Sequence, residues 1–133
     1  VFGISQPNNT KVLFDTADDL GVTTVLDTEL AEMSMREAVY RALAAVDGDL
    51  PIHLSIDLDV LPAAVAPGVS APAGFGVDYA KLRAMVSAVA ATGRVALLDV
   101  VELNPDYDVD SRTAKAAARL IDDAVTAAAR RRR

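Results

Sequence analysis

Two carboxylates stand two residues apart, directly after an apolar segment of the chain. The run is Ser55-Ile56-Asp57-Leu58-Asp59, and side chains two residues apart in an extended strand lie on the same face. Two adjacent negative charges in a partly dry site repel each other strongly. A divalent cation such as Mg²⁺ or Mn²⁺ would neutralise them, because hard cations prefer carboxylate oxygen. The alternative is that Asp59 has left the strand and is solvated, so that only Asp57 is capped by loop amides.

A third carboxylate, Glu102, closes another apolar segment, in Leu98-Asp99-Val100-Val101-Glu102-Leu103-Asn104-Pro105. Either Glu102 contributes to the same site or it is a solvated group at the end of a strand. Asp99 lies inside the apolar segment, so we expect it to support the site or to satisfy backbone groups, without contacting a substrate. The single histidine, His53, is expected to be a core residue with a satisfied ring nitrogen. The absence of cysteine excludes disulfides, thiolate metal sites and cysteine nucleophiles.

The elements that must position these carboxylates alternate along the chain. The expected strands are Val1–Ser5, Val22–Leu26, Ile52–Leu58 and Val95–Val101, and the expected helices are Lys11–Leu20, Ser34–Val46, Asp78–Gly93 and Arg112–Arg130. Nearly continuous apolar strands alternating with helices predict an α/β fold, a three-layer α/β/α arrangement with one parallel sheet of about four strands and four helices. Ligands of such sheets bind at the carboxyl ends of the strands. The segments Ser5–Thr10, Asp57 onward and Glu102 onward should therefore meet in one site.

Length and charge exclude several classes of protein. A chain of 133 residues corresponds to one domain or part of one. Its formal net charge of −6 repels phosphate backbones, so nucleic acid is not expected as a partner. No apolar run approaches the ~18 residues of a membrane span, and no signal-peptide pattern opens the chain. We expect a cytoplasmic protein that binds neither nucleic acid nor membrane.

The two carboxylate motifs, together with the loop between them, resemble the ureohydrolase family of arginases, agmatinases and formimidoylglutamases. The family pattern is Ser-x-Asp-x-Asp, then a Pro-Gly loop ending in a second proline, then Asp-x-x-Glu-x-Asn-Pro. This chain carries all three parts in order, with the loop at Pro67-Gly68-Val69-Ser70-Ala71-Pro72. The resemblance covers Ile52 to about Ala118. Leu61-Pro62, where most arginases and agmatinases have Asp-Pro, is similar to the formimidoylglutamase branch, as is Gly3-Ile4-Ser5-Gln6 followed by Asn9-Thr10.

This resemblance implies a function and a site. Formimidoylglutamases hydrolyse N-formimidoyl-L-glutamate, a small amidine, to glutamate and formamide in histidine degradation, with two Mn²⁺ ions in the complete active site. By this resemblance Asp57 bridges both ions, Asp59 binds one of them, and Glu102 binds the formimino nitrogens of the substrate. The loop Ser70-Ala71-Pro72 lines the site, and Ser5–Thr10 lies where the family meets the amino-acid end of its substrate.

The resemblance also implies that residues 1–133 are the C-terminal part of a single arginase-like domain, without its N-terminal half. The family builds its metal site from four aspartates and two histidines, and the motifs that carry both histidines do not occur here. We therefore expect no complete catalytic set in this chain, weak Mn²⁺ binding and no useful activity of the chain by itself. An exposed sheet edge should favour homo-oligomers or self-association.

Three alternatives stay open at this point. Within the family, an agmatinase- or arginase-type guanidino hydrolase would use the same carboxylates. A haloacid-dehalogenase-type phosphatase would use Asp57 as a nucleophile, but it would need a lysine near the carboxyl end of a strand. A non-catalytic binding module would leave Asp57, Asp59 and Glu102 dispersed.

Overall fold

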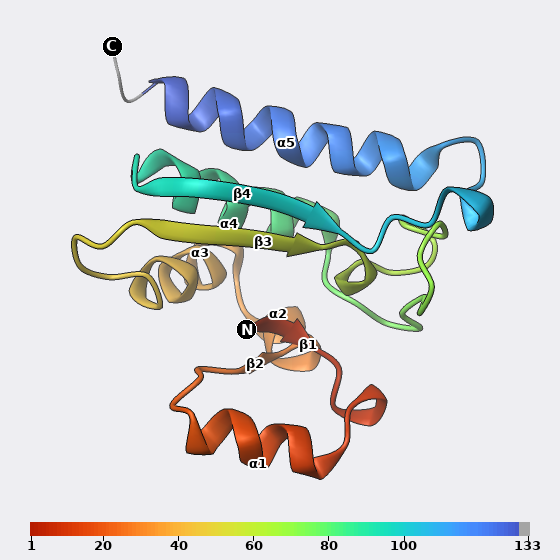
Figure 1. Cartoon of the computed structure of the whole chain (residues 1–133), viewed down its shortest axis with the longest axis horizontal. Helices are drawn as coiled ribbons and strands as arrows, with labels where there is room; N and C mark the ends of the chain where they lie inside the picture. Colours follow the sequence, from red (N-terminus) through yellow and green to blue (C-terminus); the bar gives the residue numbers. More distant parts are fainter. Residues whose placement is uncertain (131–133) are drawn as a thin grey trace.

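The computed structural model describes residues 1–130, in which short strands alternate with helices (Figure 1). The strands are β1 (Phe2–Ile4), β2 (Val25–Leu26), β3 (Ile52–Asp57) and β4 (Val95–Val101); the helices are α1 (Lys11–Asp19), α2 (Asp27–Glu32), α3 (Met35–Ala44), α4 (Tyr79–Ala91) and α5 (Arg112–Arg130). Three 3-10 turns, Gln6–Asn8, Leu58–Val60 and Pro105–Tyr107, follow β1, β3 and β4. No helix within residues 1–130 has the length and apolar character needed to cross a bilayer.

The strands form two separate parallel pairs, where the sequence predicted one sheet. β1 pairs with β2, and β3 pairs with β4 in a register that places Ser55 opposite Asp99 and Asp57 opposite Val101. Within residues 1–130 no strand pairing joins β1 to β3, because a cavity lies between them. The α/β class with parallel strands is confirmed, whereas the single continuous sheet is wrong for this part of the chain.

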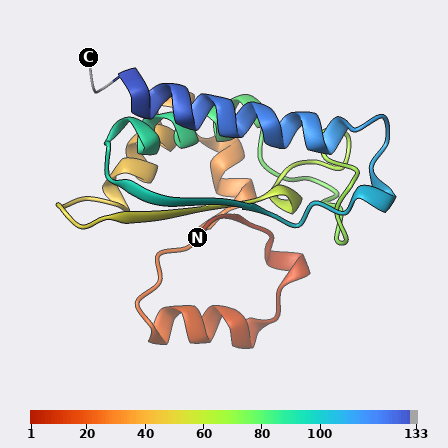
Figure 2. The same cartoon turned by 45° about the horizontal axis from the view of Figure 1, so that its top comes forward.

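Helices lie on both sides of the strands, but they are distributed unequally (Figure 2). α3, α4 and α5 cover one side of β3–β4, and α1 lies on the other side, next to β1–β2. The far face of β3–β4 is therefore bare: His53, Ser55, Asp57 and Leu97 are exposed on it. The layer expected over this face is not supplied by residues 1–130.

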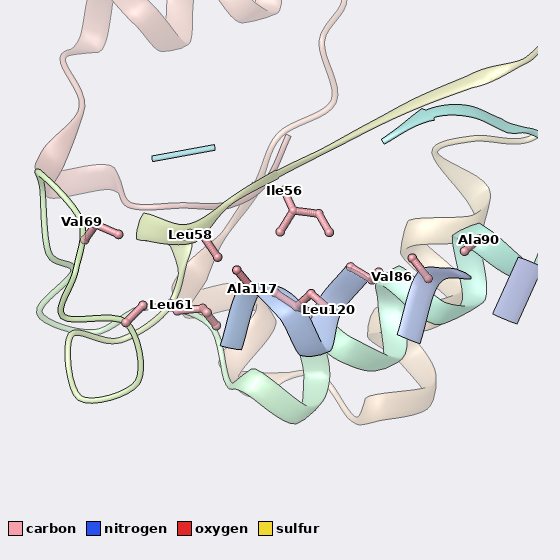
Figure 3. Packing of buried hydrophobic residues seen from close by; sticks show 10 residues of the cluster. Ile56, Leu58, Leu61, Val69, Val86, Ala90, Ala117 and Leu120 are labelled. Atoms are coloured by element: carbon pink, nitrogen blue, oxygen red, sulfur yellow. The ribbon is translucent and has the colours of Figure 1, made fainter. Parts of the chain in front are cut away.

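The core is aliphatic and consists of two clusters. The first joins β3 and its following turn to α4 and α5 (Figure 3), with Ile56, Leu58, Leu61, Val86 and Leu120 among its buried residues. The second joins β2, α2, α3 and α4, with Val25, Leu30, Ala38, Ile52 and Met85 among its buried residues. α4 contributes to both clusters, so it is the helix that connects the site-bearing strands to the N-terminal elements.

Local signals explain most element boundaries. Asp78 accepts a hydrogen bond from the N–H of Lys81 (2.9 Å), and Ser34 accepts one from the N–H of Glu37 (3.2 Å), as N-cap residues do. Two boundaries differ from expectation. β2 is only Val25–Leu26, because β1 offers it just three residues to pair with. The six-residue helix α2 was not predicted, since its pattern is too short to show helical periodicity.

Candidate active site

The first two carboxylates of the candidate site lie where β3 ends. Asp57 is the last residue of the strand, and its Oδ1 accepts a hydrogen bond from the N–H of Asp59 at 3.1 Å. This bond starts the 3-10 turn Leu58–Val60, so Asp59 has left the strand, as the alternative reading of the sequence proposed. Asp59 is nevertheless half-buried and not fully solvated. The turn keeps both carboxylates together at the carboxyl end of β3.

The pKa of Asp59 reflects its burial and the charges of two other carboxylates. The pKa of Asp59 is raised to about 6, first by burial, then by the negative charge of Asp57 and a side-chain hydrogen bond with it, and then by the charge of Glu102. The strand register agrees with this, because Asp57 pairs with Val101 and Glu102 is the next residue, so Asp57, Asp59 and Glu102 lie at the same end of the β3–β4 pair and are called the acidic cluster below. The dispersed arrangement that would favour a simple binding module is not found.

Glu102 is held in a backbone conformation that side chains rarely adopt. It follows the last residue of β4 with φ 69°, the left-handed region. A non-glycine residue there costs on the order of 1–3 kcal/mol and is retained where the surroundings over-determine it. The positive φ ends the extended conformation directly after β4, at a residue of the acidic cluster itself.

The Asn104 motif and the Pro-Gly loop are tied to each other. The backbone N–H of Asn104 donates to the carbonyl of Gly68 (2.8 Å), and its side-chain amide donates to Ser70 Oγ (3.3 Å). Gly68 has no room for a side chain, because a Cβ there would lie 2.5 Å from the Cβ of Asp108. These contacts explain why the chain needs Asn and Gly at these positions to bring the loop to the end of β4.

Three polar side chains bond to one another on the exposed face of β3–β4, and their position shows that the expectation for His53 was partly wrong. Its Nε2 lies 2.6 Å from Asp99 Oδ2, and Ser55 Oγ donates to Asp99 Oδ1. The hydrogen bond from Ser55, and then that from His53, lowers the pKa of Asp99. The ring nitrogen is satisfied as expected, but the His53 side chain is 55% exposed and not in the core, because no helix of residues 1–130 covers this face. Asp99 joins β4 to β3 through these two side chains, and its expected support of the site stays a prediction.

A cavity of about 810 Å³ joins the first loop to the carboxylates. Its lining at the carboxyl ends of the strands includes Ser5, Asn8, Asn9, Asp57, Asp59 and Ala71. The segments around Ser5–Thr10 and Ser70–Pro72 therefore share one hollow with the acidic pair, as the sequence predicted. Glu102 is not among the lining residues; it follows Val101, the last residue of β4, which pairs with Asp57.

One acidic residue at this cavity was missed from the sequence. Asp27 is 4% exposed, lines the cavity and accepts a hydrogen bond from the N–H of Thr28 at 2.8 Å. It was missed because α2 was not predicted. The available signal was Glu29, whose carboxylate accepts from the N–H of Leu26 (2.7 Å), the reciprocal half of a capping box.

The carboxylates of Asp57 and Asp59 are suitable ligands for a hard cation, but two side chains are too few to hold one. Asp57 and Asp59 offer carboxylate oxygen, which Mg²⁺ and Mn²⁺ prefer. Within residues 1–130, however, no group of three or more His, Cys, Asp or Glu side chains is arranged to hold a metal ion. The metal-binding role of Asp57 and Asp59 therefore stays a prediction.

Parallel strands with an acidic cluster at their carboxyl ends, tied to a Pro-Gly loop, define an α/β protein of the ureohydrolase type. The chain belongs to the arginase family, whose family model matches residues 1–127. This membership excludes the haloacid-dehalogenase alternative. The resemblance found in the motifs from Ile52 onward therefore extends over nearly the whole chain.

Individual relatives agree with the branch that the motifs indicated. The chain is 53% identical to a formimidoylglutamase of Nocardia farcinica over 126 residues, which are 95% of this chain and 40% of that protein. It is 52% identical to a formimidoylglutamase of Rhodococcus opacus over 127 residues, 95% of this chain and 39% of that protein. The chain thus spans about two fifths of the length of these relatives.

Solved structures show the same fold. The formimidoylglutamase of Bacillus subtilis superposes with a TM-score of 0.87 at 26% identity, over 95% of this chain and 40% of that one. A hypothetical agmatinase from Burkholderia thailandensis superposes with a TM-score of 0.80 at 31% identity, over 98% and 39%. The arginase-like α/β fold is therefore shown.

Proposed function

We propose that this chain is part of a metal-dependent formimidoylglutamase, an enzyme that catalyses a step of histidine degradation in the cytoplasm. The reaction is N-formimidoyl-L-glutamate plus water giving L-glutamate and formamide: the bond between the formimino carbon and the glutamate nitrogen breaks, and the water oxygen ends in formamide. The proposal is carried by the strand register, which pairs Asp57 with Val101 and so places Asp57, Asp59 and Glu102 at the same end of β3 and β4. The relatives at about 50% identity support the choice of substrate.

The residues of this chain would divide the work as follows. Asp57 and Asp59 would hold Mn²⁺, two ions in the complete site, and their mutual repulsion is the reason why they need a cation. When bound, Mn²⁺ supplies Lewis-acid activation of water. Glu102 would pair with the cationic formimino group and orient its carbon, because a carboxylate forms strong charge-assisted hydrogen bonds to an amidinium. The first loop, with Ser5, Asn8 and Asn9 at the cavity, would face the glutamate end.

The remaining ligands would come from outside residues 1–133, so the complete protein is the proper test. In a chimera, the 126 matched residues of the Nocardia farcinica formimidoylglutamase are replaced by their counterparts from this chain. We expect Mn²⁺-dependent release of formamide from N-formimidoyl-L-glutamate, and little hydrolysis of agmatine or arginine. A preference for agmatine or arginine would assign the chain to the guanidino hydrolases instead.

Three variants of the chimera test the roles of the carboxylates. Asp57→Asn, Asp59→Asn and Glu102→Gln should each lower kcat/KM at least 100-fold, a loss of about 2.7 kcal/mol in transition-state stabilisation. Asp49→Asn is the matched control, since Asp49 is an exposed carboxylate in the loop before β3 and should leave the rate unchanged. Full activity of Glu102→Gln would remove Glu102 from the substrate site, and full activity of Asp57→Asn and Asp59→Asn would remove the proposed metal role.

A further inference from the structure

The connection between β4 and α5 holds two polar residues that have no role in the reaction described above. Thr113, in the first turn of α5, is fully buried at 0% exposure, where a hydroxyl needs hydrogen-bond partners in place of water. Asp108 precedes the helix, and its carboxylate accepts hydrogen bonds from the N–H of Thr113 at 2.9 Å and from that of Ala114 at 3.1 Å. Asp108 therefore satisfies the first free N–H groups of α5, as a helix cap does.

The hydroxyl of Thr113 joins this cap to the Pro-Gly loop. Its Oγ1 accepts a hydrogen bond from the N–H of Gly68 at 2.7 Å, and it forms a second side-chain hydrogen bond with the carboxylate of Asp108. Burial alone would raise the pKa of Asp108, but hydrogen bonds from Thr113, Ala114 and Val109 lower it below its ordinary value. A charged carboxylate can only accept, so the Thr113 hydroxyl donates to Asp108 and accepts from Gly68.

The backbone between the two residues is held in a rare conformation. Asp110 and Ser111 have φ values of 52° and 56°, which side chains other than glycine seldom adopt. Such conformations persist where the surroundings fix them. Both residues lie in the short turn between Asp108 and Thr113, so this strained turn is what folds the Asp108 carboxylate back onto the start of α5.

Gly68 connects this turn to the segment that carries Glu102. Its N–H is held by Thr113, and its carbonyl accepts from the N–H of Asn104 at 2.8 Å. Asn104 lies two residues after Glu102, in the chain that leaves β4. In Figure 1 the loop that follows β3 lies beside this connection from β4 to α5. A continuous path of hydrogen bonds therefore runs from Asp108 through Thr113 and Gly68 to Asn104.

We propose that Thr113 is a positioning residue for Glu102: with Asp108 it fixes Gly68, and Gly68 fixes through Asn104 the segment that begins at Glu102. The proposal rests on the proposed function for the role of Glu102 toward the formimino group. Thr113 contacts neither substrate nor metal. Loss of its hydroxyl should therefore leave Mn²⁺ affinity intact and impair the orientation of the formimino carbon, on which the rate depends.

The kinetic test uses the chimera and three hydroxyl variants. Thr113→Val keeps the shape of the side chain and removes both hydrogen bonds, whereas Thr113→Ser keeps the hydroxyl. Tyr79→Phe is the matched control, because the Tyr79 hydroxyl also bonds to α5, at Ala116 O (2.9 Å), away from Gly68. We expect Thr113→Val to lower kcat about tenfold with unchanged Mn²⁺ affinity, and the other two variants to keep the parent kcat. Equal kcat values of Thr113→Val and Tyr79→Phe would overturn the proposal.

Hydrogen exchange tests the same path without catalysis. In the chimera, Thr113→Val should make the amide of Asn104 exchange about tenfold faster, because its acceptor Gly68 is then less firmly held, and Tyr79→Phe should not. A fall in kcat without faster exchange at Asn104 would contradict the proposal, since the effect would not pass through Gly68. Faster exchange in a chimera that hydrolyses no amidine would refute the proposed function alone.

A second variant covers the case in which Thr113→Val does not fold. Asp108→Asn keeps the size of the side chain and weakens the acceptor of the Thr113 hydroxyl. It should change kcat and the exchange of Asn104 in the same directions, with smaller amplitudes. An active chimera in which Asp108→Asn leaves both quantities at their parent values would refute the positioning role of Thr113 and leave the proposed function intact.

Discussion

At the scale of single residues, the acidic cluster combines two unfavourable features in one place. Burial, and then the charges of two other carboxylates, raise the pKa of Asp59 to about 6, and Glu102 is kept at a positive φ. Neither feature helps the chain to fold. Costs of this kind are concentrated at functional sites, where geometry is more important than stability. The proposed amidinium and metal partners are both cations, and cations would relieve the repulsion.

The strain at Glu102 can be measured separately from its charge. Glu102→Gln keeps the backbone strain and removes the charge, whereas Glu102→Gly removes both. Relief of the left-handed conformation is worth about 1–2 kcal/mol, partly offset by the larger freedom of glycine in the unfolded chain, about 0.5–1 kcal/mol. Urea denaturation should therefore find the Gly variant of the isolated chain about 0.5–1 kcal/mol more stable than the Gln variant. Equal stabilities would mean that the positive φ carries no strain.

How much of the site the sequence could predict depends on how local each signal is. The common location of Asp57, Asp59 and Glu102 was predictable because they lie at or just after the ends of apolar strands, and parallel strands bring their carboxyl ends together; their roles in a site stay a prediction. The positive φ of Glu102 and the buried Asp27 were not, since both depend on tertiary packing. His53 was misplaced for a related reason: an apolar strand predicts cover on both faces, and residues 1–130 leave one face of β3–β4 bare.

At the scale of elements, α4 and α5 are joined through one carboxylate. Asp123 on α5 accepts hydrogen bonds from Arg83 of α4 at 2.6 and 3.1 Å, and from Arg119 of its own helix at 3.0 Å. The hydrogen bonds from Arg83, and then those from Arg119, hold the pKa of Asp123 below its ordinary value. The carboxylate is 12% exposed, so this pairing is shielded from solvent better than a surface ion pair.

This junction predicts a pH-dependent contribution to stability. A lowered pKa in the folded state stabilises the fold above the unfolded pKa of about 3.9, and the contribution is lost as pH falls through the lower folded value. Asp123→Asn should cost about 1–2 kcal/mol in the free energy of unfolding at pH 7, and this cost should shrink only below about pH 4. The exposed neighbour Asp122 is the control, and Asp122→Asn should leave the stability unchanged. A cost of Asp123→Asn that is the same at pH 7 and pH 3 would rule out the ion pair as its source.

The element assignments from the sequence were accurate where a helix or strand has its own core contacts. The predicted bounds of Arg112–Arg130 and Val95–Val101 agree with α5 and β4, and both elements pack on the first cluster. The prediction failed at β2 and α2, which are two and six residues long. Elements of that length are determined by what lies next to them, and this information is not local in the sequence.

At the scale of the whole molecule, the amount of buried packing differs between the N-terminal elements and the rest of the chain. α4 and α5 and the strand pair β3–β4 surround a continuous aliphatic cluster, whereas α1 has no buried residue. Val12, Leu13 and Leu20 of the α1 region are all more than half exposed. The β1 strand that precedes α1 borders the cavity on the side of Val1–Ser5, so the N-terminal elements lack a continuous packed core around them.

We therefore expect α1 to open locally while the rest stays folded. A helix of nine residues without buried contacts is marginal in water, because isolated helices shorter than about 12–15 residues barely form. Hydrogen exchange should show α1 amides exchanging far faster than those of α4 and β3. In a matched pair, Ala17→Gly in α1 should leave the global free energy of unfolding unchanged, whereas Ala118→Gly on the exposed side of α5 should cost about 1 kcal/mol. If Ala17→Gly lowered the free energy of unfolding as much as Ala118→Gly, α1 would belong to the same cooperative unit as the core. The exposure of α1 would then be a poor guide to its local stability.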